Sequence, residues 1–396
     1  MILGLDFGAS RVKSCLLQSL KDNYIHFDSK GSLFFSNKIG IVNKDFFITS
    51  LKRHLDFYLK KNLKITKIII CGEMHGFFYS KGKTISNYYS WRCKNKISFD
   101  DTLNKKNFIS MTGMRPRIEI PYFKIKELKG INEVFGISEF ICKKLGKFNN
   151  VLHSTYAQSL GLYILKNRKL IINKELSSIN KNIKINYGYF NNIGTITYKK
   201  KTISIYGGFG DLQCSNKLMA MRKNRLILNL STGSQLIFKY KSKKNDLDYR
   251  ITFNKGLYSC ITHIPSGRYL IYLAEKLKIP KKKFFNNLGT INISKLNFIE
   301  YKHYDLKDLN TNFKKIFKKV SKNEFLEIII FVYVNQYLKL LKELKFEKLI
   351  ITGGISFYLG NFISYLKYIF PRQTIEVSYS EDETIKFLLE HKSKLC

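Results

Sequence analysis

Residues 2–17 read Ile2-Leu3-Gly4-Leu5-Asp6-Phe7-Gly8-Ala9-Ser10-Arg11-Val12-Lys13-Ser14-Cys15-Leu16-Leu17, which predicts a strand, a turn of small residues and a second strand. The same theme returns in Leu226-Ile227-Leu228-Asn229-Leu230-Ser231-Thr232-Gly233-Ser234-Gln235-Leu236-Ile237-Phe238. Each hairpin has a tip built from Gly, Ser, Ala or Thr. The repetition predicts two related halves, joined near residues 215–225.

Each half also contains a buried strand that ends in a glycine turn, at residues 68–72 and 349–354. Residues 323–344 have the length and composition of a helix, with Leu326, Ile330, Val334 and Leu338 on one side. Short β-branched runs alternating with helical stretches indicate an α/β protein. We therefore expect two α/β domains, at roughly residues 1–215 and 216–396.

Bulk composition excludes several classes of protein. The chain has 396 residues, 44% of them hydrophobic, which suffices for two domain cores. It opens without the basic and apolar regions of a signal peptide, and its most apolar stretch, Ile328 to Val334, is far too short to span a bilayer. Seven scattered cysteines indicate reduced thiols, so we expect a soluble, cytoplasmic protein.

The net charge of +40 raises the possibility of nucleic-acid binding. The lysines, however, are spread over the whole chain among many Ile, Asn, Phe and Tyr residues. We interpret them as a solvated basic surface whose field attracts anionic substrates such as a nucleotide.

The two hairpin tips are candidate phosphate sites, because small residues let backbone N–H groups approach an anion closely. Asp6 stands just before the first tip and could hold Mg²⁺ through water, and Lys13 could neutralise phosphate charge. Gly82-Lys83-Thr84 suggests a P-loop, but its spacing from Gly76 is one residue too long and no helix follows, so we reject that interpretation.

Asp211 is the candidate catalytic residue. It lies in the glycine-rich segment Gly207 to Ser215, after a strand predicted at residues 202–206. An alcohol that attacks a γ-phosphoryl group must lose its proton, and a positioned aspartate can accept it. A lone aspartate in a glycine-rich loop is also often a turn former.

These ordered motifs resemble the FGGY family of carbohydrate kinases over most of the chain. The matching stretches are Asp6 to Ser10 with Lys13, Asn229 to Gln235, Ile351 to Gly354, and Gly210 to Ser215. The resemblance implies two actin/hexokinase-like (ribonuclease H-like) domains related by duplication, with an ATP cleft between them. Residues 1–215 would form the sugar-binding domain that carries the catalytic Asp211, and residues 216–396 the nucleotide-binding domain.

The resemblance also assigns residues to ATP and Mg²⁺. Asp6 would hold the metal through water. The residues expected to contact the nucleotide are Asp6, Gly8, Ala9, Ser10, Lys13, Thr232, Gly233, Ser234, Gly353 and Gly354.

Within this family, Cys71-Gly72-Glu73-Met74-His75-Gly76 and Gly210-Asp211-Leu212-Gln213-Cys214-Ser215 are most similar to segments of the sedoheptulose kinases. This likeness implies that Met74, His75, Arg92 and Gln213 bind the sugar. Two departures concern that site: Glu73 replaces a glutamine, and residues 87–93 lack the aspartate and glutamine of the family's sugar-binding segment.

We therefore expect an ATP-dependent kinase that phosphorylates a primary hydroxyl of a ketose, with sedoheptulose converted to sedoheptulose 7-phosphate. The alternatives are a kinase for another sugar, such as a xylulose-like ketose or a polyol, and a catalytically silent relative that binds a sugar or nucleotide. A nucleic-acid-binding protein is suggested by charge alone. The expected partners are the sugar and ATP, with no nucleic acid and no membrane, and a homodimer is possible.

Overall fold

The computed structural model describes residues 1–8, 12–17, 24–29, 40–93, 105–188, 192–210, 213–214, 224–231, 233–239, 247–253, 255–262, 264–296 and 298–378. These residues form two compact units. Unit 1 comprises the described residues within 1–217 and 242–258, and unit 2 those within 218–241 and 259–381. The expected domain limit at residues 215 and 216 stays a prediction, because residues 215–223 lie outside the described part.

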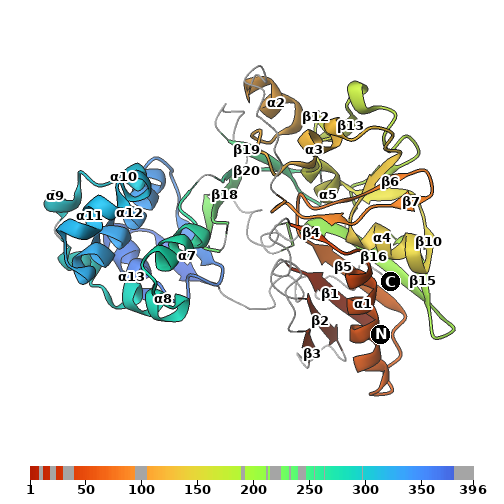
Figure 1. Cartoon of the computed structure of the whole chain (residues 1–396), viewed down its shortest axis with the longest axis horizontal. Coiled ribbons are helices and arrows are strands. Elements are labelled where there is room, and N and C mark those ends of the chain that lie inside the picture. The colour runs from red at the N-terminus through yellow and green to blue at the C-terminus, as the bar shows by residue number, and fades with distance from the viewer. Residues whose placement is uncertain are drawn as a thin grey trace. The chain divides into compact units, whose positions relative to one another are not determined.

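Unit 1 is built on a seven-stranded sheet with the order β10-β15-β16-β5-β1-β2-β3 (Figure 1). Strand β1 pairs antiparallel with β2 and parallel with β5, which in turn pairs parallel with β16. The first hairpin and the strand at residues 68–72 are thus confirmed. The strands are β1 (Ile2–Phe7), β2 (Val12–Leu17), β3 (Tyr24–Ser29), β5 (Lys67–Gly72), β10 (Gly146–Phe148), β15 (Asn192–Tyr198) and β16 (Lys201–Gly210).

Helices pack against this mixed sheet, and its central strand β5 is buried on both faces. Helices α1 and α4 contact each other and lie on the same face (Figure 1). The helices are α1 (Asp45–Leu59), α2 (Lys105–Thr112), α3 (Pro121–Glu127), α4 (Ile137–Leu145) and α5 (Ser154–Ser159), with a 3₁₀ turn at Lys174–Leu176.

Short strands of unit 1 form small additional sheets. They are β4 (Ile41–Val42), β6 (Phe78–Lys81), β7 (Thr84–Ile85), β8 (Tyr88–Tyr89), β9 (Glu133–Phe135), β11 (Val151–His153), β12 (Tyr163–Lys166), β13 (Lys169–Ile172) and β14 (Lys184–Asn186). Gly82 and Lys83 form the turn between β6 and β7 and Thr84 begins a strand, so the rejection of a P-loop is confirmed.

The second main sheet has the order β19-β20-β18-β17-β21-β22. Strand β17 pairs antiparallel with β18 and parallel with β21, and β21 pairs parallel with β22. The strands are β17 (Arg225–Asn229), β18 (Gln235–Lys239), β19 (Asp248–Ile251), β20 (Leu257–Ile261), β21 (Lys348–Thr352) and β22 (Thr374–Val377). The second hairpin and the strand that precedes Gly353 are therefore confirmed.

The two sheets repeat one arrangement, in which a hairpin is followed on its first-strand side by two parallel strands. The order β2-β1-β5-β16 in unit 1 corresponds to β18-β17-β21-β22 in unit 2. The duplication expected from the two glycine-tipped hairpins is thus present in the topology.

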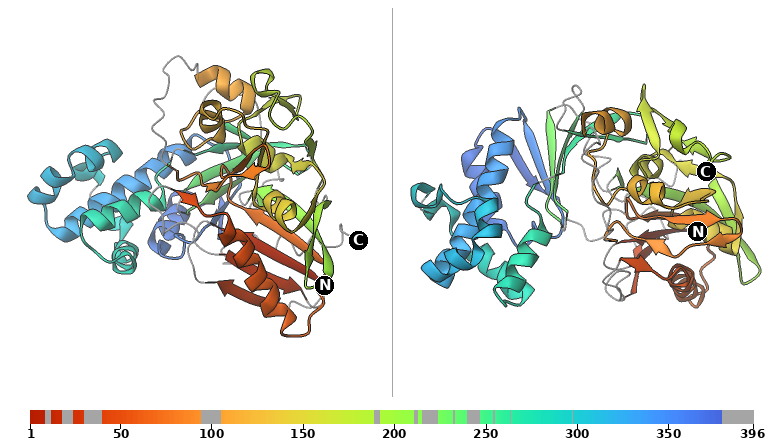
Figure 2. Two further views of the ribbon diagram at one scale, coloured as in Figure 1. Left: turned by 45° about the vertical axis from the view of Figure 1, so that its right-hand side comes forward. Right: turned by 45° about the horizontal axis from the view of Figure 1, so that its top comes forward.

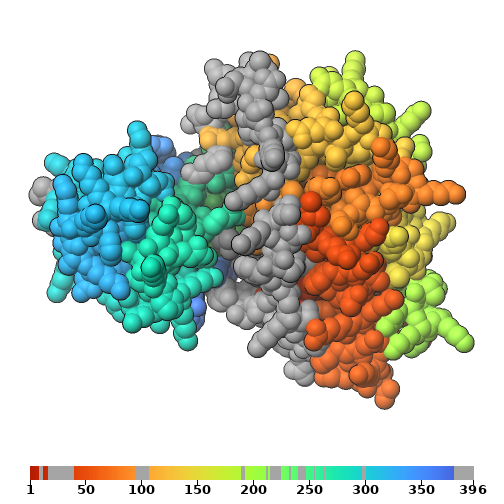
Figure 3. All heavy atoms as spheres, in the orientation of Figure 1, coloured from red at the N-terminus to blue at the C-terminus, as the bar shows by residue number. Residues whose placement is uncertain are grey.

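The helices of unit 2 lie beside its sheet (Figure 2). The helices within residues 267–290 lie at the surface of this unit (Figure 3). The helix expected at residues 323–344 is α12 (Lys322–Lys342), which starts with a capping box between Ser321 and Glu324. This helix is buried on almost every side, where the sequence indicated one apolar face. The helices are α7 (Gly267–Lys276), α8 (Lys281–Thr290), α9 (Phe298–Tyr301), α10 (Leu306–Thr311), α11 (Phe313–Lys319), α12 (Lys322–Lys342) and α13 (Gly360–Ile369), with a 3₁₀ turn at Ile293–Lys295.

Six cysteines lie in the described part, and all six are buried free thiols. None of the helices described is long and apolar enough to cross a membrane.

Candidate active site

The carboxyl ends of three parallel strands meet at one edge of the sheet in unit 1. Strands β1, β5 and β16 end at Phe7, Gly72 and Gly210. The segments that follow them are the predicted phosphate motif, the segment with Met74 and His75, and the segment with Asp211. In open α/β sheets ligands bind at the carboxyl ends of the strands, so this edge is the candidate site of unit 1.

The structure places Asp6 and Lys13 opposite each other on the hairpin of β1 and β2. The Cys71 thiol on β5 donates a hydrogen bond to Asp6 Oδ1 at 3.4 Å. Both Asp6 and Lys13 are partly exposed beside the tip. Gly8 is described next to them, whereas Ala9 and Ser10 lie outside the described residues.

Two of the predicted sugar-binding residues lie against Gly210, the residue that precedes Asp211. A Cβ atom at Gly210 would lie 2.4 Å from Gln213 Oε1 and 3.0 Å from Met74 Cγ. Only a glycine therefore allows both side chains to pack this closely. Asp211 itself lies outside the described residues, but its chain neighbour Gly210 fixes where the segment leaves β16.

The Gln213 side chain is 2% exposed, and neither its amide nitrogen nor its oxygen has a hydrogen-bond partner within the described chain. Buried amides in folded proteins almost always find partners. An unpaired donor and acceptor at this place fit a role in binding a hydroxylated ligand.

His75 is held in one tautomer. Its backbone has a φ of 64°, and its Nδ1 lies 2.7 Å from the Ser159 carbonyl oxygen, which can only accept a hydrogen bond. Nδ1 therefore donates. Burial, aided by the positive charges of Arg250 and Arg117, lowers the pKa of His75 well below its usual value, so the ring is neutral. Nε2 then carries a lone pair that can accept a hydrogen bond from a hydroxyl group.

The substituted residue Glu73 is 3% exposed and lies among cations. Burial lowers the pKa values of Arg92 and Lys124, and the negative charge of Glu73 opposes the shift in both. A Cβ atom at Gly76 would lie 2.6 Å from Glu73 Oε1 and closer still to the Tyr88 hydroxyl. Glycine at position 76 is thus needed for Glu73 and Tyr88 to pack here.

Within the altered segment 87–93, strand β8 is followed by a turn at residues 90–93. The Ser90 hydroxyl accepts a hydrogen bond from the Arg92 backbone N–H at 3.2 Å, and the Cys93 N–H donates to the Ser90 carbonyl at 2.9 Å. Trp91, the only tryptophan of the chain, has the Arg92 guanidinium 5.1 Å from its ring centre. Ser90 is fully buried and shapes the backbone that presents Arg92.

Sequence reasoning missed a buried ion-pair cluster in unit 1. Asp248 on β19 is fully buried and accepts hydrogen bonds from Arg117 at 2.8 Å and Arg250 at 3.1 Å. The amide of Gln158 anchors the same strand, donating to the Tyr249 carbonyl and accepting from the Ile251 N–H. No motif marks this cluster, because Arg117 and Gln158 lie far along the chain from the strand that carries Asp248 and Arg250.

In unit 2, the tip between β17 and β18 forms the second candidate phosphate site. The Ser231 hydroxyl donates to the Gly233 carbonyl at 3.2 Å, and the buried Ser234 hydroxyl donates to the Ser231 carbonyl at 3.3 Å. The space beside Gly233 is open, since a Cβ atom there would meet no atom within 4 Å. Thr232, also predicted here, lies outside the described residues.

Gly353 has a packing role that the sequence did not predict. Its φ is +93°, and a Cβ atom would lie 2.4 Å from the Leu230 carbonyl oxygen. The turn after β21 therefore needs glycine to fit against the end of β17. The next residue, Gly354, which the resemblance assigns to the nucleotide, lines a pocket.

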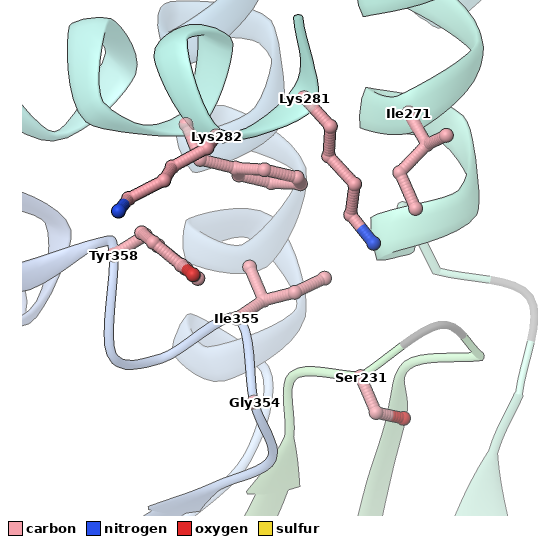
Figure 4. Close-up of a pocket in the computed structure, with 8 residues that line it drawn as sticks. Ser231, Ile271, Lys281, Lys282, Gly354, Ile355 and Tyr358 are labelled. Atoms are coloured by element: carbon pink, nitrogen blue, oxygen red, sulfur yellow. The ribbon is translucent and has the colours of Figure 1, made fainter. Parts of the chain in front are cut away.

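This pocket has a volume of about 410 Å³ and belongs entirely to unit 2 (Figure 4). The Phe285 and Tyr358 rings lie 5.4 Å apart and are tilted by 31°. Pockets of this size with aromatic walls and a few polar groups commonly bind small molecules. The lining residues are Ser231, Ile271, Lys281, Lys282, Phe285, Gly354, Ile355 and Tyr358.

Ser231 and Gly354 were anticipated through the motifs that contain them. The lysines of α8 were not, because in a chain of +40 net charge a lysine run carries little information.

No protein-family model matches the chain, and no curated protein matches it in sequence. Its fold, however, is similar to several solved structures. A ligand-bound xylulose kinase from Lactobacillus acidophilus superposes with a TM-score of 0.72 and 15% identity, over 100% of this chain and 90% of that one. A gluconate kinase from the same organism gives 0.71 and 14%, over 100% and 89%.

A glycerol kinase with ADP from Plasmodium falciparum gives a TM-score of 0.70 and 15% identity, over 99% of this chain and 90% of that one. These likenesses establish the fold: the chain has the duplicated, two-domain actin/hexokinase-like architecture that the sequence predicted.

Proposed function

We propose that the protein is an ATP-dependent carbohydrate kinase that transfers the γ-phosphoryl group to a primary hydroxyl of a ketose. The proposal is carried by the edge of unit 1, where Met74 and Gln213 pack against the glycine that precedes Asp211. The proposed general base Asp211 and the side chains of Met74 and Gln213 follow the ends of neighbouring strands. This arrangement suits the binding and deprotonation of a sugar hydroxyl. The fold shared with xylulose, gluconate and glycerol kinases supports the same reaction.

The proposal assigns the sugar to unit 1. His75 Nε2 accepts a hydrogen bond from one hydroxyl, and the amide of Gln213 can both donate and accept. Arg92, whose charge Glu73 partly balances, donates to a further oxygen. Asp211 takes the proton of the attacking hydroxyl, which must be lost as the new P–O bond forms.

ATP is assigned to unit 2, whose pocket combines an aromatic wall with hydroxyl and ammonium groups. The donor set at the edge of unit 1 also fits Mg²⁺, because Asp6 offers a partly exposed carboxylate beside the tip of the first hairpin. Bound through water to Asp6, the metal would neutralise charge on the phosphates. Alignment of the hydroxyl and the phosphates accounts for most of the expected rate enhancement.

Sedoheptulose is the proposed sugar, on the likeness of residues 71–76 and 210–215 to sedoheptulose kinases. Glu73 replaces a glutamine of the family's pattern, and residues 87–93 lack the aspartate and the glutamine of its sugar-binding segment. A site built on hydrogen bonds rejects a sugar that leaves its polar groups unpaired, so another ketose, a polyol or an aldonate is the alternative outcome of the test.

Purified protein with ATP and Mg²⁺ is tested in a coupled ADP-release assay against sedoheptulose, D-xylulose, D-ribulose, gluconate and glycerol, with the phosphorylated carbon located by NMR. Turnover of a sugar supports the kinase, and its identity settles the substrate. Binding of a sugar or nucleotide by calorimetry without any ADP release would instead identify a catalytically silent relative.

His75→Asn serves as the matched variant in that assay. Asparagine tolerates the left-handed backbone of position 75 and can still donate to the Ser159 carbonyl, but it lacks the acceptor nitrogen. We expect the KM for the sugar to rise roughly tenfold while the KM for ATP is unchanged. An unchanged KM for the sugar would remove His75 from the binding site.

A further inference from the structure

The pocket of unit 2 carries positive charge without any negative charge. Lys281 and Lys282 are its only charged lining residues among those described, and both come from the first turn of α8. In Figure 4, Lys281 extends toward the side on which Ser231 and Ile271 lie, and Lys282 toward the side of Tyr358. The two ammonium groups therefore face different parts of one cavity.

The start of α8 is electrostatically unfavourable by itself. Its first turn contains Lys281, Lys282 and Lys283, no acidic residue and no side-chain cap. The N-terminal end of a helix repels cations, so three lysines here gain nothing from the helix itself. An anion in the adjoining cavity would turn this repulsion into attraction.

The opposite wall of the pocket is made of backbone and small side chains. The tip of the hairpin is fixed there because the Gly267 N–H donates to the Ser231 carbonyl at 2.9 Å and the Ile355 N–H donates to the Leu230 carbonyl at 3.0 Å. The rings of Phe285 and Tyr358 form a separate, apolar part of the wall. The pocket thus has a polar side at Ser231 and Lys281 and an aromatic side at Tyr358.

We propose that Lys281 binds the polyphosphate of the nucleotide, across the cavity from the hairpin tip at Ser231, while Phe285 and Tyr358 contact the base. This inference rests on the proposed use of ATP and adds a phosphate-binding cation that comes from a helix outside the hairpin motifs. An ammonium group is a point charge that binds phosphate oxygens whatever the base. The contribution of Lys281 is therefore the same for ATP and GTP and absent for a nucleoside.

The test is equilibrium binding of ADP with Mg²⁺, measured by calorimetry on the full chain, with adenosine measured as a competitor. Lys281→Gln removes the charge and keeps most of the side chain. We expect it to weaken ADP binding roughly tenfold, to leave adenosine binding unchanged, and to reduce the salt dependence of ADP binding. Lys281→Arg should restore most of the affinity for ADP.

Lys283→Gln is the matched control, because Lys283 belongs to the same turn and is exposed but does not line the pocket. Equal ADP affinity in the wild type, Lys281→Gln and Lys283→Gln overturns the inference while leaving ATP use intact. Equal losses of ADP and adenosine in Lys281→Gln would also overturn it, because they indicate a collapsed pocket. A wild-type protein that binds no nucleotide contradicts both this inference and the proposed function.

Discussion

The two units repeat one hairpin-and-strand arrangement, but different types of residue lie at the carboxyl ends of its strands. In unit 1, the ends of the strands carry reactive or hydrogen-bonding side chains, including Asp6, Met74 and His75. In unit 2, the segments that follow the corresponding strands carry serine and glycine, and the charged groups of the pocket come from helix α8. The duplicated scaffold therefore supplies two edges, of which one presents side chains and the other presents mainly backbone.

This difference fits a division of chemical work. A sugar is recognised by directed hydrogen bonds to its hydroxyls, which need side chains in fixed tautomers and orientations, as at His75. Phosphates are recognised by backbone N–H groups and by point charges, which need small residues and little side-chain precision. Substitutions at the edge of unit 1 should therefore change sugar binding and catalysis, whereas substitutions at the edge of unit 2 should change the affinity for the nucleotide.

The largest effect is expected at Asp211. Asp211→Asn keeps the size of the side chain but removes the acceptor for the hydroxyl proton, so kcat should fall roughly 10²- to 10⁴-fold. Steady-state kinetics with the sugar identified in the panel measure the change, and calorimetry with ADP checks the nucleotide site. We expect ADP affinity to be unchanged, because the proposal assigns the nucleotide to the other unit.

A normal kcat in Asp211→Asn would remove this residue from catalysis and would leave it as a turn former. A parallel loss of ADP affinity would contradict the assignment of sugar and nucleotide to different edges.

The sequence predicted the parts of this arrangement that are local. The paired strands of the two hairpins and the strand before Gly353 follow from short stretches of chain, and all lie where expected. It could not predict interactions between distant segments, such as the ion pair of Asp248 with Arg117, because no local pattern links them. Lys281 was not predicted as a site residue for another reason. The lysines in the first turn of its helix do not stand out in a chain that contains 69 lysines and arginines.

The residues on which the site prediction most depends remain predictions. Ala9, Ser10, Asp211 and Thr232 lie outside the described residues. What the structure adds is the placement of their neighbours, above all Gly210 against Met74 and Gln213.

Glycine substitutions in unit 2 give the second prediction. Gly353→Ala places a methyl group 2.4 Å from the Leu230 carbonyl oxygen on a backbone with a φ of +93°. Strain and overpacking together should lower the free energy of unfolding by about 3 kcal/mol. Urea denaturation measures the loss, and Gly233→Ala is the control because its methyl group meets no atom within 4 Å.

Gly233→Ala should change the free energy of unfolding by less than about 0.5 kcal/mol. If the tip binds phosphate, the same substitution should lower the affinity for ADP. Equal stability of the two variants would show that Gly353 is dispensable for packing and would return it to a purely ligand-binding role.

The smallest effect concerns pH and separates the units again. Burial lowers the pKa of His54 and of His153 to about 4, and that of His75 below its usual value. The unfolded chain binds these protons first, so stability is complete above pH 6.5 and falls as the pH drops toward 4. At pH 5, the lowered pKa values of His54 and His153 should each reduce the free energy of unfolding by about 2 kcal/mol relative to neutral pH.

One buried carboxyl group opposes this trend. Burial raises the pKa of Glu139 to about 7, so its contribution to stability is complete below about pH 4.5 and is lost as the pH rises toward 7. On acidification, protonation of Glu139 raises the free energy of unfolding by about 3 kcal/mol at most. This gain is smaller than the loss that protonation of the three histidines causes. All four groups belong to unit 1, whereas the one histidine described in unit 2, His303, is exposed.

Unit 1 should therefore lose stability first as the pH falls from 7 to 5, by roughly 2 kcal/mol. Hydrogen exchange followed by mass spectrometry, corrected for the intrinsic rate at each pH, resolves the two units. Glu139→Gln removes the opposing carboxyl group and should steepen the loss in unit 1 alone. Equal loss of protection in both units, or earlier loss in unit 2, would show that these buried histidines do not set the acid stability of the sugar-binding unit.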